Sequence, residues 1–146
     1  MKSVIQRVSS ASVTVNNKIV GSIQSGLLVL FGVHINDTEP QLLWMCDKIS
    51  NLRIFDDENG VMNKSVRDVN GEILMVSQFT LYGNLKKGTR PSYIEAARPE
   101  KAIPMYEKAI DYLKSTTGLN IKSGVFGADM CVELVNDGPV TIILEK

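Results

Sequence analysis

Residues 26–33 (GLLVLFGV) are almost continuously apolar, and this run constrains the fold more than any other part of the chain. A strand with one face in water alternates apolar and polar residues, whereas a strand buried on both faces is apolar throughout. The chain must therefore supply material that covers both faces of this strand.

Short strands are predicted on both sides of this run. Residues 4–8 and 12–15 alternate, and Asn16-Asn17 predicts a tight turn into a strand at residues 18–23. The turn signals at residues 56–60 (DDENG) and at Asn70-Gly71 separate further strands. These further strands are expected at residues 52–55, 72–79, 119–122, 130–135 and 140–144.

Two segments have helical signals. Thr38 and Gln41 have the spacing of a capping box, so a helix is predicted to begin there. Pro99 opens a second predicted helix, Pro104 lies in its second turn, and Gly118 closes it. The apolar faces would consist of Leu42, Met45, Ile49 and Leu52 in the first helix, and Ala102, Met105, Tyr106, Ala109 and Leu113 in the second.

Strands outnumber helices, so a mostly β body with both helices packed on one side is expected. The pattern alone leaves open whether the strands form a barrel or two stacked sheets. No linker, repeat or low-complexity segment divides the chain, so residues 1–146 are predicted to form a single domain.

The composition limits which nucleic acids and membranes the chain is expected to bind. The chain has 16 basic and 16 acidic residues, whereas a protein that tracks many phosphates usually has a basic excess. Extensive duplex binding is therefore not expected, but binding of a nucleic-acid end needs only a few local cations. No apolar run is long enough to span a bilayer, and the first ten residues lack a signal-peptide core. We expect a cytoplasmic protein with no membrane contact.

The sequence offers little conventional catalytic chemistry. It contains no CxxC, HExxH or carboxylate cluster, so neither a metal nor another cofactor is predicted. Its one histidine, His34, follows the buried strand without any motif around it and is interpreted as structural. Cys46 and Cys131 lie in apolar stretches and are predicted to be core residues. An enzyme built from this chain would have to work without a typical triad.

Two polar segments stand out. SQFTL (residues 77–81) ends the predicted strand at 72–79, and NDGPVT (residues 136–141) lies between the last two predicted strands. Taken alone, the first is typical of the polar end of an edge strand, and the second of an Asp-Gly turn before a proline.

Taken together, they resemble the two signature motifs of D-aminoacyl-tRNA deacylases. The similarity also includes VIQRVSSASVTV near the start, LRIFDDENGVMNKSVRDVNGEILMVSQFTLYG, KKGTRPSY, GVFGADM and VELVNDGPVT. The resemblance implies a layered β/β/α body and a homodimer. The implied activity is hydrolysis of the ester between a D-amino acid and the 3′ end of tRNA.

The resemblance places the catalytic element at Ser77, Gln78, Phe79 and Thr80. Main-chain N–H groups around Phe79 and Thr80 would stabilise the oxyanion, and Gln78 would shape the pocket. Thr80 could instead act as a nucleophile, although no base is near it in sequence. The 2′-hydroxyl of the terminal ribose is the other candidate for assisting proton transfer.

The resemblance also implies a substrate-binding set of five residues. Gly138 and Pro139 match a Gly-cisPro dipeptide that enters the partner's active site and rejects L-amino acids. Arg7 would hold that element, although an exposed strand arginine is the plain alternative. Met130 and Ala97 would line the pocket, although both also suit ordinary core positions. An exclusion based on side-chain direction would also admit glycine, so glycyl-tRNA is a further expected substrate.

The densest basic cluster is Lys86, Lys87 and Arg90, which suits either a phosphate contact or a solvated loop. Two other functions stay open on the sequence. One is nucleic-acid binding without catalysis, and the other is hydrolysis of small D-amino-acid esters.

Overall fold

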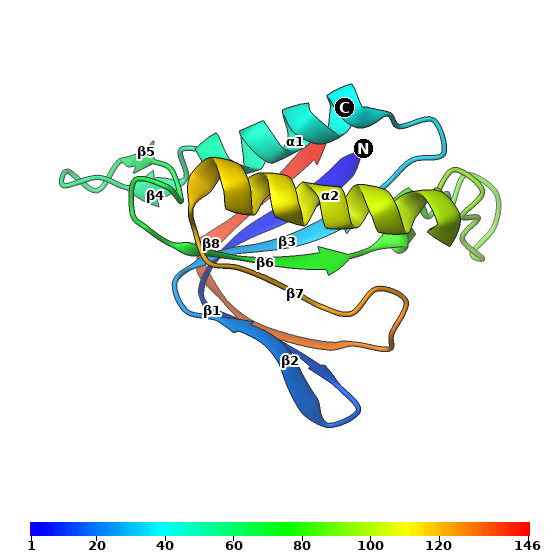
Figure 1. The fold of residues 1–146 in the computed structure, drawn as a ribbon, viewed down its shortest axis with the longest axis horizontal. Helices are drawn as coiled ribbons and strands as arrows, with labels where there is room; N and C mark the ends of the chain where they lie inside the picture. The colour runs from blue at the N-terminus through cyan, green and yellow to red at the C-terminus, as the bar shows by residue number, and fades with distance from the viewer.

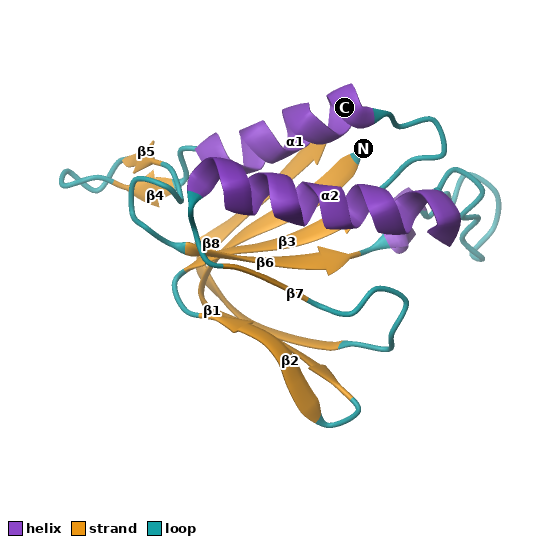
Figure 2. Cartoon of the chain, viewed as in Figure 1, coloured by secondary structure: helices purple, strands orange, loops and turns teal.

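The computed structural model describes residues 1–146 as a strongly curved sheet with two helices across one face (Figure 1, Figure 2). The predicted mostly β, layered body with both helices on one side is confirmed. The strands are β1 (Lys2–Val15), β2 (Lys18–Ile23), β3 (Gly26–Gly32), β4 (Phe55–Asp56), β5 (Met62–Lys64), β6 (Glu72–Ser77), β7 (Ile121–Ser123) and β8 (Cys131–Glu145). The helices are α1 (Glu39–Asn51), the short 3-10 helix η1 (Phe79–Tyr82) and α2 (Pro99–Thr117).

Strand β1 organises the main sheet, whose order is β2-β1-β3-β6-β7, with β8 also pairing with β1. Residues 2–8 of β1 pair with β3 and residues 11–15 pair with β2, while β8 runs antiparallel along nearly the whole strand. The pairs β3–β6 and β6–β7 are parallel. A Cβ atom at Gly21 of β2 would stand 2.7 Å from the Ser123 carbonyl oxygen of β7, so the sheet curls nearly to closure.

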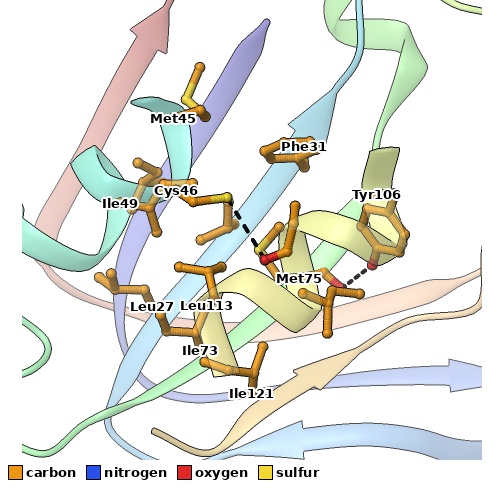
Figure 3. Close-up of a cluster of buried hydrophobic side chains, with 14 of the residues drawn as sticks. Leu27, Phe31, Met45, Cys46, Ile49, Ile73, Met75, Tyr106, Leu113 and Ile121 are labelled. Atoms are coloured by element: carbon orange, nitrogen blue, oxygen red, sulfur yellow. Dashed lines mark hydrogen bonds between the residues drawn. The ribbon is translucent and has the colours of Figure 1, made fainter. Parts of the chain in front are cut away.

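The larger core cluster lies between the helices and the sheet (Figure 3). Cys46 of α1 is buried there, with its Sγ 3.8 Å from the Ala109 carbonyl oxygen of α2. Burial raises the pKa of the Cys46 thiol to about 12, so this side chain stays a neutral packing group. The labelled members around it are Leu27, Phe31, Met45, Ile49, Ile73, Met75, Tyr106, Leu113 and Ile121.

A smaller cluster covers the opposite face of the sheet. Leu28 of β3 and Leu74 of β6 are paired in register and both point into it. The other buried members are Val8, Ala11, Val13, Ile23 and Val76. Strand β3 is thus covered on both faces, as its continuous apolar run predicts.

The helix boundaries agree with the sequence signals. The Thr38 amide donates to Gln41 Oε1 at 3.0 Å, which forms one half of the predicted capping box before α1. Helix α2 begins at Pro99, contains Pro104, and ends at Gly118, whose φ of 69° is the left-handed value that glycine adopts readily. Neither helix is long and apolar enough to cross a bilayer.

Several strand predictions are wrong. The segments 4–8 and 12–15 belong to the single strand β1, and the segments 130–135 and 140–144 belong to the single strand β8. The strand predicted at 52–55 is reduced to β4, which begins at Phe55. Cys131, predicted in the core, is exposed because it lies on the outward side of the edge strand β8. Residues 136–139 have the composition of a turn but lie inside the paired strand β8.

We predict that Gly26→Ala lowers the free energy of unfolding by about 1–3 kcal/mol, the usual cost of overpacking. A Cβ atom at Gly26 would lie 1.9 Å from the Glu72 carbonyl oxygen, so β3 and β6 would have to separate. Urea denaturation measures the loss. The neighbouring exposed change Ser25→Ala is the control and should stay within about 0.5 kcal/mol. Equal stability of the two variants would contradict this account of the strand spacing.

Candidate functional site

A cavity of about 870 Å³ opens where β3 and β6 end. It lies between these strand ends, the beginning of α2 and the segment that leads into β8. A volume of this size accommodates a nucleoside or a drug-sized ligand. The wall is mainly apolar and includes Phe31, Val76, Ala97, Tyr106, Phe126 and Met130.

The chain turns out of the sheet directly after Ser77. The Gln78 amide donates to the Phe31 carbonyl oxygen at 2.8 Å, and the next residue begins η1. The strand predicted at residues 72–79 therefore ends two residues early, because its partner β3 ends at Gly32. A Cβ atom at Gly32 would lie 3.1 Å from the Gln78 carbonyl oxygen, so glycine lets the turn approach closely.

This turn presents main-chain amides beside the cavity. Among the hydrogen bonds outside regular elements, the amides of Gln78 and Leu81 donate, but those of Phe79 and Thr80 do not. The Gln78 side chain donates to the Thr80 hydroxyl. Ser77, Gln78 and Phe79 line the cavity, whereas Thr80 lies outside its wall.

Two other predicted site residues line the same cavity. The Ala97 amide donates to the Val33 carbonyl oxygen at 2.9 Å, which fixes the segment before α2 against the end of β3. Met130 packs over Gly124, where a Cβ atom would come within 2.5 Å of the methionine Sδ. The structure thus brings Ala97 and Met130 together with Ser77, Gln78 and Phe79.

The wall offers no imidazole and no carboxylate. Burial raises the pKa of Tyr106, whose hydroxyl donates to the Met75 carbonyl oxygen at 2.7 Å and therefore stays protonated at neutral pH (Figure 3). His34 is not part of the wall. Its Nδ1 accepts the Asn36 amide at 3.0 Å, and its ring centroid lies 5.2 Å from that of Tyr82.

The other predicted site residues, Arg7, Gly138 and Pro139, lie where β1 pairs with β8, on the edge of β1 that does not pair with β3. Gln6 pairs with Thr141 and Val8 pairs with Asn136, so residues 137–140 of β8 all stand opposite Arg7. The Asn136 side chain closes this bulge by accepting the Val140 amide at 3.0 Å. The Gly138–Pro139 peptide bond in the bulge is cis, and both residues are exposed.

Arg7 anchors the bulge through several contacts. Its Nε lies 3.2 Å from both the carbonyl oxygen and the Oδ2 of Asp137. Its Nη1 donates to the Ile54 carbonyl oxygen at 2.8 Å and lies 3.4 Å from Asp56 Oδ1. Sequence reasoning missed Ile54 and Asp56, because nothing in their local pattern connects them with β1.

The two groups do not meet within one chain. Val132 near the start of β8 lines the cavity, but at the level of the bulge β1 and β3 lie between β8 and β6. Three inter-strand spacings amount to about 14 Å across the sheet. Neither Arg7, Gly138 nor Pro139 lines the cavity. A single chain therefore carries both elements on separate surfaces.

The architecture is that of a known class of proteins. A solved structure described as a probable eukaryotic D-amino acid tRNA deacylase superposes with a TM-score of 0.85 at 17% identity, covering 98% of this chain and 97% of that one. At this identity the likeness shows the fold alone.

Closer relatives define the family. The family model D-Tyr-tRNA(Tyr) deacylase matches residues 4–145, so the chain belongs to that family. A D-aminoacyl-tRNA deacylase of Flavobacterium psychrophilum is 57% identical over 146 residues, covering 100% of this chain and 97% of the relative. The solved structure of the c-Myc DNA Unwinding Element Binding Protein is 46% identical to this chain and superposes with a TM-score of 0.95. The superposition covers 100% of this chain and 99% of that one.

We predict that Arg7→Lys lowers the free energy of unfolding by about 1–3 kcal/mol, because a lysine leaves at least one buried carbonyl partner without a donor. Urea denaturation measures this loss. Arg53→Lys is the matched control, since Arg53 is exposed and donates only to the Asn63 carbonyl oxygen. That control should change stability by less than about 0.5 kcal/mol. An equally small effect of both changes would mean that Arg7 does not anchor the bulge.

Proposed function

We propose that this protein hydrolyses the ester bond of D-aminoacyl-tRNA and releases free D-amino acid and tRNA. The observation that carries the proposal is a cavity lined by Phe79, in a chain of the D-Tyr-tRNA(Tyr) deacylase family. The amides of Phe79 and of the next residue, Thr80, donate no main-chain hydrogen bond outside the regular elements. The cavity would hold the terminal adenosine and the aminoacyl group. We further propose that the protein works in the cytoplasm as a single-domain homodimer.

The chemistry relies on main-chain groups. Water attacks the ester carbonyl, negative charge develops on its oxygen, and the amides of Phe79 and Thr80 donate to it without any change of protonation. Ser77 and Gln78 shape the cavity, and Gln78 holds the Thr80 hydroxyl. With no base in the wall, the 2′-hydroxyl of the terminal ribose is better placed to assist proton transfer than Thr80 is to act as a nucleophile.

Chirality requires a separate element, which we assign to Gly138 and Pro139 of a second copy. D and L isomers carry the same groups, so the site must deny space to one side-chain direction. The main chain of Gly138 and Pro139 is exposed and is held by Arg7, which suits this role. Because these two residues lie away from the cavity of their own chain, they are better placed to act on the cavity of a partner. An element of this kind rejects L side chains and leaves glycine unopposed, so glycyl-tRNA is a second substrate.

A second candidate function is nucleic-acid binding without hydrolysis. It is favoured by one observation, the name of the 46% identical protein, which refers to binding of a DNA unwinding element. In that case, the cavity of the present protein would bind a nucleotide without cleaving any ester.

The decisive experiment compares matched D-tyrosyl-tRNA and L-tyrosyl-tRNA and follows loss of the ester. We expect the D ester to be hydrolysed faster by at least about a hundredfold, which corresponds to about 2.7 kcal/mol of differential stabilisation. Binding without cleavage supports the second candidate. Equal hydrolysis of both isomers removes the chiral role of Gly138 and Pro139.

We predict that Gly138→Ala lowers the ratio of kcat/KM for D over L substrate by at least about tenfold, or about 1.4 kcal/mol. Gly138 has a φ of 126°, and a Cβ atom there would lie 2.7 Å from Val140 Cγ2 and 3.2 Å from Arg7 Nη2, so the bulge must move. The matched control is Gly60→Ala, which also has a positive φ of 73° but faces open space. Its ratio should equal that of the wild type. The same ratio in both variants would mean that the bulge takes no part in selectivity.

A further inference from the structure

An exposed aromatic pair lies at the mouth of the cavity. Phe79 and Tyr93 meet edge to face, with ring centroids 5.1 Å apart and an interplanar angle of 75°. Both line the cavity, yet their exposed fractions are 57% and 38%. Ile94 follows at the same rim and is 82% exposed. We call Phe79, Tyr93 and Ile94 the rim. Large apolar side chains this exposed beside a ligand cavity commonly mark a contact surface.

The chain beside the rim carries the main local excess of positive charge. Residues 82–98 contain Lys86, Lys87, Arg90 and Arg98 but only one acidic residue, Glu95. All four cations are exposed, and none of them is within an ion pair. Because the whole chain has a net charge of zero, this excess is a local feature and not a property of the surface as a whole.

Geometry joins the rim to three of these cations. Asn84 and Ser92 exchange two main-chain hydrogen bonds of 2.9 and 3.0 Å, which close the loop that carries Lys86, Lys87 and Arg90. We call residues 84–92 the basic loop. Tyr93 follows its closing bridge directly, and a Cβ atom at Gly83 would lie 3.2 Å from the Tyr93 ring. Figure 1 shows this loop projecting beyond the ends of β6 and α2. Cavity, aromatic rim and basic loop therefore follow one another along one side of the molecule.

We propose that the rim is a stacking platform for the base that precedes the terminal adenosine, and that the basic loop binds the adjoining phosphates. The inference rests on the proposed function and deepens it by assigning a binding surface to the single-stranded 3′ end of RNA outside the cavity. Aromatic rings stack on any base, while nearby cations follow the backbone. This combination would let a chain without net positive charge bind the single-stranded end of an RNA.

The test compares two substrates of different length. D-tyrosyl-tRNA reaches both cavity and rim, whereas the D-tyrosyl ester of adenosine alone reaches only the cavity. Tyr93→Ala should raise KM for the tRNA about 5- to 150-fold more than KM for the adenosine ester, the range expected for one lost stack. Tyr93→Phe keeps the ring and should restore the wild-type ratio of the two KM values. An equal rise for both substrates, or no rise, overturns the platform.

The basic loop has its own measurement. Lys86→Gln combined with Lys87→Gln should raise KM for tRNA and reduce its dependence on salt, because fewer counterions are released on binding. Lys18→Gln combined with Lys122→Gln is the matched control, since both lysines are exposed and lie on other strands. An equal change of the salt dependence in both double variants overturns the role of the basic loop.

Two further outcomes separate the possibilities. If the wild type cleaves neither the tRNA ester nor the adenosine ester, the proposed function itself fails. If Tyr93→Ala instead changes the oligomeric state measured by size-exclusion chromatography, the rim is an interface between copies of this chain, and the stacking platform is refuted.

Discussion

The parallel pairing of β3 and β6 lies inside the core and ends at the cavity, where Phe31 and Ser77 form part of the wall. Both strands are packed on two faces, and their register runs from Gly26 opposite Glu72 to Phe31 opposite Ser77. Because parallel strands end at the same edge of a sheet, the chain leaves β6 beside the end of β3. The amides of Phe79 and Thr80 are thus held in place by main-chain pairing, and a shift of the ladder would move them.

Where β1 pairs with β8, Arg7 fixes the bulge of β8 in a similar way. A buried guanidinium is stable only when its donors find partners, and Arg7 finds them on both β8 and the segment around β4. One side chain therefore connects three segments that are distant in sequence. In the bulge at residues 137–140, Val140 also packs against the larger core cluster, while Arg7 holds Asp137.

The sequence predicted what depends on local patterns. The apolar run at residues 26–33 indicated a strand covered on both faces, and Thr38, Pro99 and Gly118 marked the helix ends correctly. Long-range register was not predictable in the same way. The NDGPVT segment has the composition of a turn, and only its pairing with β1 shows that it is a bulge inside one strand. The contacts of Arg7 with Ile54 and Asp56 likewise depend on how distant segments meet.

The placement of the two elements has a consequence for the proposed mechanism. One chain carries its cavity at the end of β6 and its exposed bulge beyond β1, and none of residues 137–140 lines that cavity. If the bulge selects the isomer, then every working cavity contains main chain from two copies. Selectivity and hydrolysis would then respond differently to dilution below the dissociation constant of the dimer. A separated subunit would keep its oxyanion amides but lose the element that excludes L-amino acids, so discrimination would fall before ester cleavage did.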